Sequence, residues 1–324
     1  MPTLAPFTLH RAVSASHAAA LLARLPGARI VAGGTDLVPN LRRGIGAPPA
    51  LVDVTSIADF DSIARDGDGW RIGAATTLAA LAADGSIARD LPALAQAAAT
   101  VAGPGHRTVA TLGGNLCLDT RCLFYNQSEW WRRSNDYCLK LGGSTCHVAP
   151  QGRRCHAAFS GDAAPALIAY DAEVEAVGPQ GARRLPLAEL YADDGARHLA
   201  LAADELVVAV YVPPQPVGAR SGYRKARVRG ALDFPLAGVA MRATFDHGRL
   251  ATLRVALTGT NSRPLALADT DALCGAPVDA ALLAQLAKRI GKQVSPMRTT
   301  VTSSHYRRQV AIVQAQRLLR ELAA

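Results

Sequence analysis

The sequence has few aromatic residues and no long apolar run. Aromatic side chains make up 5% of the 324 residues. No apolar stretch reaches the roughly 20 residues that a membrane helix needs, so no membrane span is predicted. The N-terminus lacks a basic segment followed by an apolar one, which favours a cytoplasmic location. Zinc-finger spacing, RNA-recognition motifs and basic runs interleaved with aromatics are also missing, so the net charge of +9 does not predict a nucleic-acid partner.

The composition is that of a folded chain, with 49% hydrophobic residues over a length that suits two or three domains. Residues 1–55 show a short β-α-β pattern. A strand at Val208–Val212 ends at Pro213-Pro214, which suggests a domain boundary near residue 215. The third region, 216–324, ends with a helix expected from about His305 to Leu322, with Val310, Val313 and Leu318 on its apolar face. Because the order lacks a steady β-α alternation, the predicted fold class is α+β.

Two Gly-Gly segments each lie close to an expected strand. The first runs from Val31 to Leu37 and contains Gly33-Gly34-Thr35-Asp36; the second ends in Thr111-Leu112-Gly113-Gly114-Asn115. Adjacent glycines allow a tight turn whose N–H groups can approach an anion. Neither segment matches the dinucleotide or P-loop fingerprints, and an ordinary turn is the alternative for each. As a pair they favour one long bisphosphate ligand.

Five of the six cysteines gather between the second Gly-Gly segment and Ser160. Four of them, Cys122, Cys138, Cys146 and Cys155, have 15, 7 and 8 residues between them. This spacing matches neither a zinc ribbon nor the compact bacterial ferredoxin run. Clustered thiols in a reducing compartment still favour a metal centre, and the surrounding arginines and lysine suit the negative charge of a [4Fe-4S] cluster. Zinc and unligated thiols are the alternatives. Cys117 is expected to be a packed thiol that could replace one of the four, and Cys274 to be structural.

The two Gly-Gly segments, followed by Ser160-Gly-Asp162, resemble the FAD-binding medium subunit of the xanthine dehydrogenase/carbon monoxide dehydrogenase family of molybdenum hydroxylases. Weaker similarity extends over Glu205–Val208, Tyr223–Arg227 and Thr258–Pro264. The resemblance implies a first FAD-binding subdomain over 1–55, a second over 56–215 and a C-terminal α+β domain over 216–324. It implies that this chain binds FAD and holds no catalytic residue of its own.

The family resemblance also implies which residues contact FAD. The first segment would wrap the pyrophosphate, the second would hold the other side of the phosphates and the ribityl chain, and the remaining residues would contact the cofactor from the far side. Asp162 would accept a hydrogen bond from it, although a helix N-cap is the alternative for Asp162 and a solvated strand lysine for Lys225. The implied set is Ile30, Val31, Ala32, Gly33, Gly34, Thr35, Asp36, Leu37, Val101, Thr111, Leu112, Gly113, Gly114, Asn115, Asp162, Leu206 and Lys225.

The chain departs from the family pattern by an insertion over about residues 117–158. Asn115 and Asp162 lie 47 positions apart, whereas the family has about ten residues there. An FAD subunit with a cysteine-bearing insertion resembles the 4-hydroxybenzoyl-CoA reductase branch. That branch implies electron flow from ferredoxin through [4Fe-4S] and FAD to [2Fe-2S] centres on a small subunit and molybdenum on a large subunit, in a dimer of heterotrimers. The alternatives are a subunit of an oxidising carbon monoxide, aldehyde or xanthine dehydrogenase, and a zinc-bearing nucleic-acid module.

Overall fold

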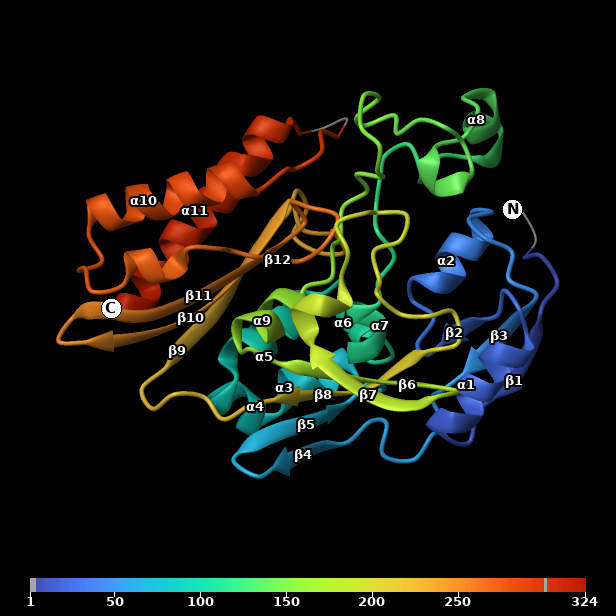
Figure 1. Ribbon diagram of the computed structural model, residues 1–324, viewed down its shortest axis with the longest axis horizontal. Coiled ribbons are helices and arrows are strands. Elements are labelled where there is room, and N and C mark those ends of the chain that lie inside the picture. Colours follow the sequence, from blue (N-terminus) through green and yellow to red (C-terminus); the bar gives the residue numbers. More distant parts are fainter. Residues whose placement is uncertain (1–3, 300–301) are drawn as a thin grey trace.

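The computed structural model describes residues 4–299 and 302–324, which form three β-sheets with their covering helices (Figure 1). The sheets hold three, five and four strands and span residues 8–53, 63–212 and 220–266. Mixed helix and strand without a regular alternation confirms the α+β class. Among the described helices, none is long and apolar enough to cross a bilayer.

The first sheet is parallel, in the order β1-β3-β2. Its elements are β1 (Thr8–Arg11), α1 (Ala15–Arg24), β2 (Arg29–Val31), α2 (Leu37–Arg42) and β3 (Ala50–Asp53). Helix α1 begins where Ser14 accepts a hydrogen bond from the His17 amide, and its buried face packs Leu21 and Leu22 into the same core as Val52. The predicted β-α-β pattern is therefore correct.

The second sheet is antiparallel, in the order β4-β5-β8-β6-β7. Its strands are β4 (Ile63–Asp66), β5 (Gly69–Gly73), β6 (Glu173–Gly178), β7 (Gly181–Pro186) and β8 (Leu206–Val212). The associated helices are α3 (Leu78–Ala83), α4 (Gly85–Asp90), α5 (Pro92–Thr100), α6 (Pro104–Arg107), α7 (Leu112–Leu116), α9 (Ala163–Ala169) and the 3-10 turn η2 (Leu187–Leu190). The Ala-rich helix α5 is buried, and the separate short helix α6 follows it, starting at Pro104.

The insertion projects from the body of the molecule as the green segment near α2 in Figure 1. It contains α8 (Glu129–Ser134) and the 3-10 turn η1 (Leu139–Leu141). Its base closes where Arg121 and Ala158 exchange backbone hydrogen bonds of 2.7 Å in both directions. A separate small core joins the insertion to Ile45, beyond α2, and to Met297, near the C-terminal helices. The insertion is thus anchored to both flanking regions.

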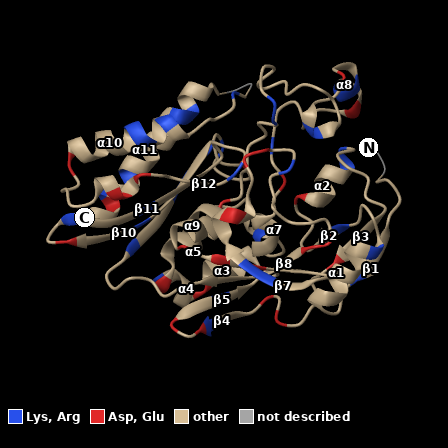
Figure 2. Cartoon of the chain, viewed as in Figure 1, with Lys and Arg blue, Asp and Glu red and all other residues tan. Residues whose placement is uncertain are grey.

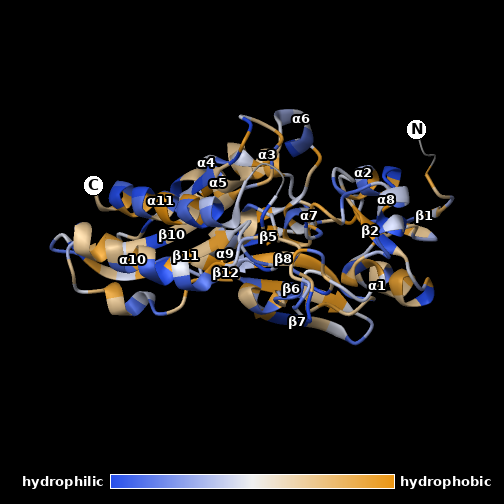
Figure 3. Cartoon of the chain, turned by 90° about the horizontal axis from the view of Figure 1, so that it is seen from above, coloured by the Kyte–Doolittle hydropathy of each residue, from blue (hydrophilic) through white to orange (hydrophobic). Residues whose placement is uncertain are grey.

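The C-terminal region is an antiparallel sheet, β12-β11-β10-β9, with two helices on one side (Figures 1 and 3). Its elements are β9 (Arg220–Ala226), β10 (Ala237–Asp246), β11 (Arg249–Thr258), β12 (Leu265–Ala266), η3 (Thr270–Leu273), α10 (Ala280–Gln293) and α11 (Ser304–Ala323). Helix α11 buries Ala311, Ala315 and Leu318, and Val310 packs against the same core. The predicted apolar face is therefore right for Val310 and Leu318 and wrong for Val313, which is exposed. Lysines and arginines mark the outer surface of both helices (Figure 2).

Candidate functional site

A cleft of about 700 Å³ runs between the first sheet, the second sheet and the base of the insertion. Its volume is within the range of cofactor sites. The cleft is lined by almost every residue that the sequence predicted for FAD, drawn from segments far apart in the chain: Ile30–Leu37, Val101, Thr111, Gly113–Asn115, Asp162, Leu206 and Lys225. Leu112 is the exception, because its side chain is fully buried in the core of the second region.

The first Gly-Gly loop leaves its backbone amides free. Gly34 has φ +66°, a conformation that glycine adopts without strain. Within residues 4–299 and 302–324, the amides of Gly33, Gly34, Thr35 and Asp36 donate no hydrogen bond. Consecutive unpaired N–H groups beside a cleft form a concave binding site for an anion. Because its unpaired amides lie beside the cleft, the loop is suited to binding a pyrophosphate.

The second Gly-Gly loop uses its amides to hold the fold together. Leu112 and Gly113 donate to the carbonyls of Thr76 and Ala74 at 2.8 and 2.7 Å. The Gly114 amide donates to Thr111 Oγ1 at 3.2 Å, and the Asn115 amide to the Thr111 carbonyl at 2.9 Å. The predicted role in holding phosphates therefore rests on the side chains that line the cleft, since these amides are already paired.

The two loops touch directly. A Cβ built on Gly33 would lie 1.9 Å from the Val109 carbonyl oxygen, which is closer than any side chain can approach. The segment that leads into the second loop thus closes against the first loop. Glycine at position 33 is required by this close approach.

Asp162 and Lys225 form a buried ion pair on the cleft wall. Lys225 Nζ lies 2.8 Å from Asp162 Oδ2, and the Tyr223 hydroxyl donates to Asp162 Oδ1 at 2.5 Å. Burial raises the pKa of Asp162, while the Lys225 charge and the two hydrogen bonds oppose that rise. Asp162 precedes α9 but makes no side-chain cap bond, and Lys225 is buried, so both alternatives from the sequence are wrong.

The four cysteines predicted as metal ligands converge on one small pocket. Cys122, Cys138, Cys146 and Cys155 line it together with Phe124, Tyr125, Leu139, Lys140, His147 and Val148. All four are free thiols. Burial raises the pKa of the Cys122 thiol, although backbone amides of Tyr125 and Phe124 hydrogen-bond to it and lower that pKa. Burial also raises the pKa of Cys155 to about 11.

Within the described residues, no three His, Cys, Asp or Glu side chains are arranged to hold a single metal ion. A cubane distributes its ligands over four irons, so its thiolates stand farther apart than the ligands of one zinc ion. The four thiols thus share one pocket, without forming such a single-ion group within the described residues. The other two cysteines lie elsewhere: Cys117 lines the large cleft, where burial raises its pKa to about 12, and the Cys274 thiol faces the Thr270 carbonyl.

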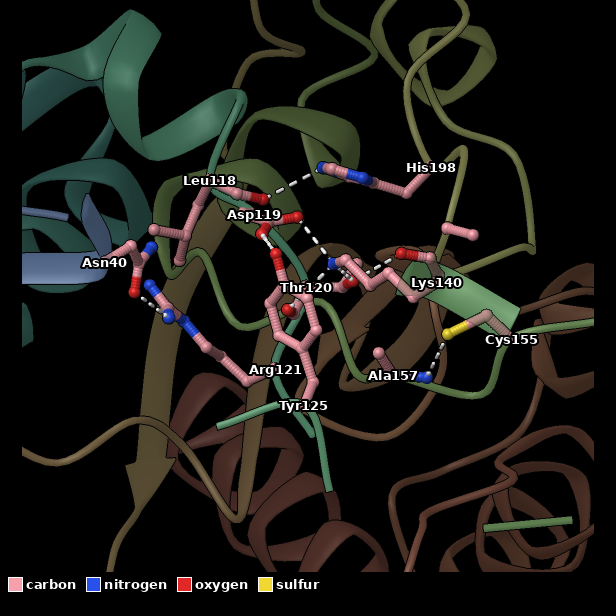
Figure 4. A network of polar contacts seen from close by, with 12 residues as sticks. Asn40, Leu118, Asp119, Thr120, Arg121, Tyr125, Lys140, Cys155, Ala157 and His198 are labelled. Carbon is pink, nitrogen blue, oxygen red and sulfur yellow. Dashed lines mark hydrogen bonds and ion pairs between the residues drawn. The ribbon is translucent and has the colours of Figure 1, made fainter. Parts of the chain in front are cut away.

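A polar network joins Asp119, Thr120, Tyr125 and Lys140 at the base of the insertion (Figure 4). Lys140 Nζ donates to Asp119 Oδ1 at 2.6 Å and to Thr120 Oγ1 at 2.5 Å, and the Tyr125 hydroxyl donates to Asp119 Oδ2 at 3.1 Å. Nearby, the His198 ring bonds the Leu118 carbonyl at 2.9 Å. The network thus ties Tyr125 and Lys140 of the insertion, and His198 farther along the chain, to the segment after α7.

Sequence reasoning missed the residues that join the insertion to the first loop. Arg121 pairs with Asp36, donates to Asn40 Oδ1 at 2.9 Å and lies 5.2 Å from the Phe234 ring centroid. These partners are about 80 or more positions away from Arg121 in the chain. The spacing of Asp36 and Asn40 on one face of α2 was the available clue.

Comparison with known proteins identifies the family of this chain. Residues 5–215 match the family described as the FAD binding domain in molybdopterin dehydrogenase, and residues 202–322 match the CO dehydrogenase flavoprotein C-terminal domain. The chain belongs to this family of FAD-binding subunits.

Named relatives agree with the family. The chain is 35% identical to the aldehyde oxidoreductase FAD-binding subunit PaoB of Escherichia coli (strain K12), over 82% of this chain and 85% of that one. It is 29% identical to the xanthine dehydrogenase FAD-binding subunit of Escherichia coli O157:H7, over 97% and 95%. The fold matches reconstituted CO dehydrogenase from Oligotropha carboxidovorans with a TM-score of 0.83, at 24% identity over 99% of each chain.

Proposed function

We propose that this chain is the electron-transfer flavoprotein subunit of an oxidising molybdenum hydroxylase, and that its insertion carries a [4Fe-4S] cluster. The observation that supports the cluster is the convergence of Cys122, Cys138, Cys146 and Cys155 on one pocket next to the FAD cleft. The oxidising direction is supported by relatives named as an aldehyde oxidoreductase and dehydrogenases. This direction was the alternative in the sequence analysis and replaces the reductase expectation as the main proposal.

In this proposal the substrate reacts on a partner subunit with a molybdenum cofactor, and a small [2Fe-2S] subunit passes electrons to FAD. Bound FAD accepts one or two electrons, which suits a relay between one- and two-electron centres. The chain's own residues would hold the cofactor: the free amides of the first loop would bind the pyrophosphate, and the buried Asp162–Lys225 pair would line another part of the same cleft. A ferredoxin-type protein would exchange electrons with the cluster. The cytoplasm is the proposed compartment, since it keeps thiols reduced.

Reductive dehydroxylation of 4-hydroxybenzoyl-CoA is the second candidate. The cysteine-bearing insertion favours it, because a cluster beside FAD can serve as an entrance for low-potential electrons. None of the relatives named above carries that activity in its name. The assembled enzyme, with its large and small subunits, should separate the two: oxidation of aldehydes or xanthine with an artificial acceptor supports the first, and reduction of 4-hydroxybenzoyl-CoA with a low-potential donor supports the second.

The cluster is tested by replacing each of the six cysteines with serine in turn. Iron analysis and low-temperature EPR should show cluster loss for positions 122, 138, 146 and 155, with FAD retained. Cys117→Ser and Cys274→Ser are the matched controls and should keep the iron. If none of the six variants changes the iron content, the cluster proposal fails while the family assignment stands.

A further inference from the structure

The four-cysteine pocket and the FAD cleft meet at one side chain. Among the residues that the structure describes, Tyr125 alone lines both spaces. It also lies three positions after Cys122 in the chain. The residue therefore offers a short path through the chain's covalent bonds from a thiol to the wall of the cleft.

The Tyr125 ring is held by charges on two sides. Lys140 Nζ lies 4.4 Å from the ring centroid, a cation–π contact, and the hydroxyl donates to Asp119. Lys140 and Asp119 are themselves paired at 2.6 Å, and both side chains are largely buried. Figure 4 shows the ring beside this pair, with Cys155 beyond Lys140. Because Lys140 holds the face of the ring and Asp119 holds its hydroxyl, the ring stays at a constant distance from the cysteine pocket and from the FAD cleft.

We propose that Tyr125 is the bridge through which single electrons pass between the cluster and FAD. Because the path needs a cluster at its far end, it rests on the [4Fe-4S] centre proposed above. Each transfer moves one electron: FAD is oxidised by one electron while the cluster is reduced by one, or the reverse. The phenol itself is neither oxidised nor deprotonated, and its hydroxyl keeps the hydrogen bond that it donates to Asp119.

Phe124 is a suitable control for the proposed electron-transfer role of Tyr125. Its ring lines the same cysteine pocket but not the cleft, and it packs on Trp131 and His147 with centroids 5.9 and 5.4 Å away. It is the neighbour of Tyr125 in the chain and lies two positions after Cys122. The two residues therefore share their relation to the cluster pocket and differ in contact with the cleft.

The test is flash photoreduction of the purified chain loaded with FAD and iron, following electron equilibration between flavin and cluster by absorbance. Tyr125→Leu should slow equilibration while iron, FAD and the cluster EPR signal remain. Tyr125→Phe keeps the ring and should restore the fast phase. Phe124→Leu, which removes an aromatic ring of the same pocket, should equilibrate like the unsubstituted chain.

Tyr125→Met is prepared in parallel, since its flexible side chain fills irregular space and protects the pocket from collapse. Equilibration at the unsubstituted rate in Tyr125→Leu or Tyr125→Met would overturn the bridge. So would loss of iron from both variants with FAD retained, which would assign the ring a structural role. Iron analysis of the unsubstituted chain reports separately on the cluster, so failure of the bridge and failure of the cluster give different results.

Discussion

The two Gly-Gly loops look alike in sequence and differ in what their backbones do. In the first, the amides of Gly33 to Asp36 have no partner among the residues that the structure describes, and they lie beside the cleft. In the second, the amides of Leu112 to Asn115 donate hydrogen bonds to Thr76, Ala74 and Thr111. An anion site needs donors without partners, whereas a buried segment needs every donor paired. The same dipeptide thus forms a binding loop in one place and a packed junction in the other.

Their glycines are required for different reasons. Gly33 lies against the Val109 carbonyl, and Gly34 has a positive φ. Gly113 lies against Ala74, where a Cβ would come within 2.9 Å of the Ala74 Cβ and 3.0 Å of its carbonyl oxygen. Substitutions in the first loop should act on FAD binding, and those in the second on stability.

The largest expected effect is loss of FAD from Gly33→Ala. The added Cβ would overlap the Val109 carbonyl, so the first loop must move away from the second and its amides leave the cleft. Flavin released by acid and quantified per chain should fall to a small fraction of the unsubstituted value. Gly105→Ala is the control, because nothing lies within 4 Å of its Cβ. Full FAD occupancy in Gly33→Ala would break the comparison.

Breaking the Asp162–Lys225 pair should cause the largest loss of stability. Lys225→Met leaves a buried carboxylate without its partner, which costs roughly 3–5 kcal/mol. Because the Ala163 amide donates to Asn115 Oδ1, this loss should also loosen the second loop. Denaturant unfolding measures it. Adding Asp162→Asn to Lys225→Met should recover part of the free energy, and no recovery would mean that the pair is not the cause.

Acid should destabilise the segment after the second loop through His198. Burial lowers the pKa of His198 from 6.5 to about 4 in the folded chain. The unfolded chain therefore binds the proton first, and stability falls as pH drops from about 6.5 towards 4, by a total on the order of 3 kcal/mol. His198→Gln cannot take up the proton, so its stability should vary less with pH over this window. Equal slopes for both proteins would refute the assignment.

A smaller effect is expected for Gly113→Ala. The Cβ would crowd Ala74 and cost about 1–3 kcal/mol of folding free energy. FAD affinity should change much less than in Gly33→Ala, because the free amides of the first loop are untouched. Thermal unfolding of the apoprotein and flavin titration measure the two quantities. A Gly113→Ala chain of normal stability that cannot bind FAD would reverse the roles of the loops.

The sequence was sufficient to predict the fold class and a set of residues that nearly all line the cleft, because glycine pairs, strand patterns and clustered cysteines are local signals. It was not sufficient to predict that the amides of one loop are free and those of the other are paired. Pairing of the Leu112 and Gly113 amides depends on Thr76 and Ala74, which lie in another segment. Burial of Lys225 against Asp162, and the link from Arg121 to Asp36, are long-range in the same way. The proposed domain limits at 55 and 215 remain predictions.

Hydrogen–deuterium exchange of the two loops, with and without FAD, tests the central distinction most directly. The amides of Gly33 to Asp36 should exchange fast in the apoprotein and become protected when FAD binds, because they have no partner in the fold. Those of Leu112 to Asn115 should be protected in both states. Fast exchange of the second loop in the apoprotein, or no protection of the first loop on addition of FAD, would contradict this account.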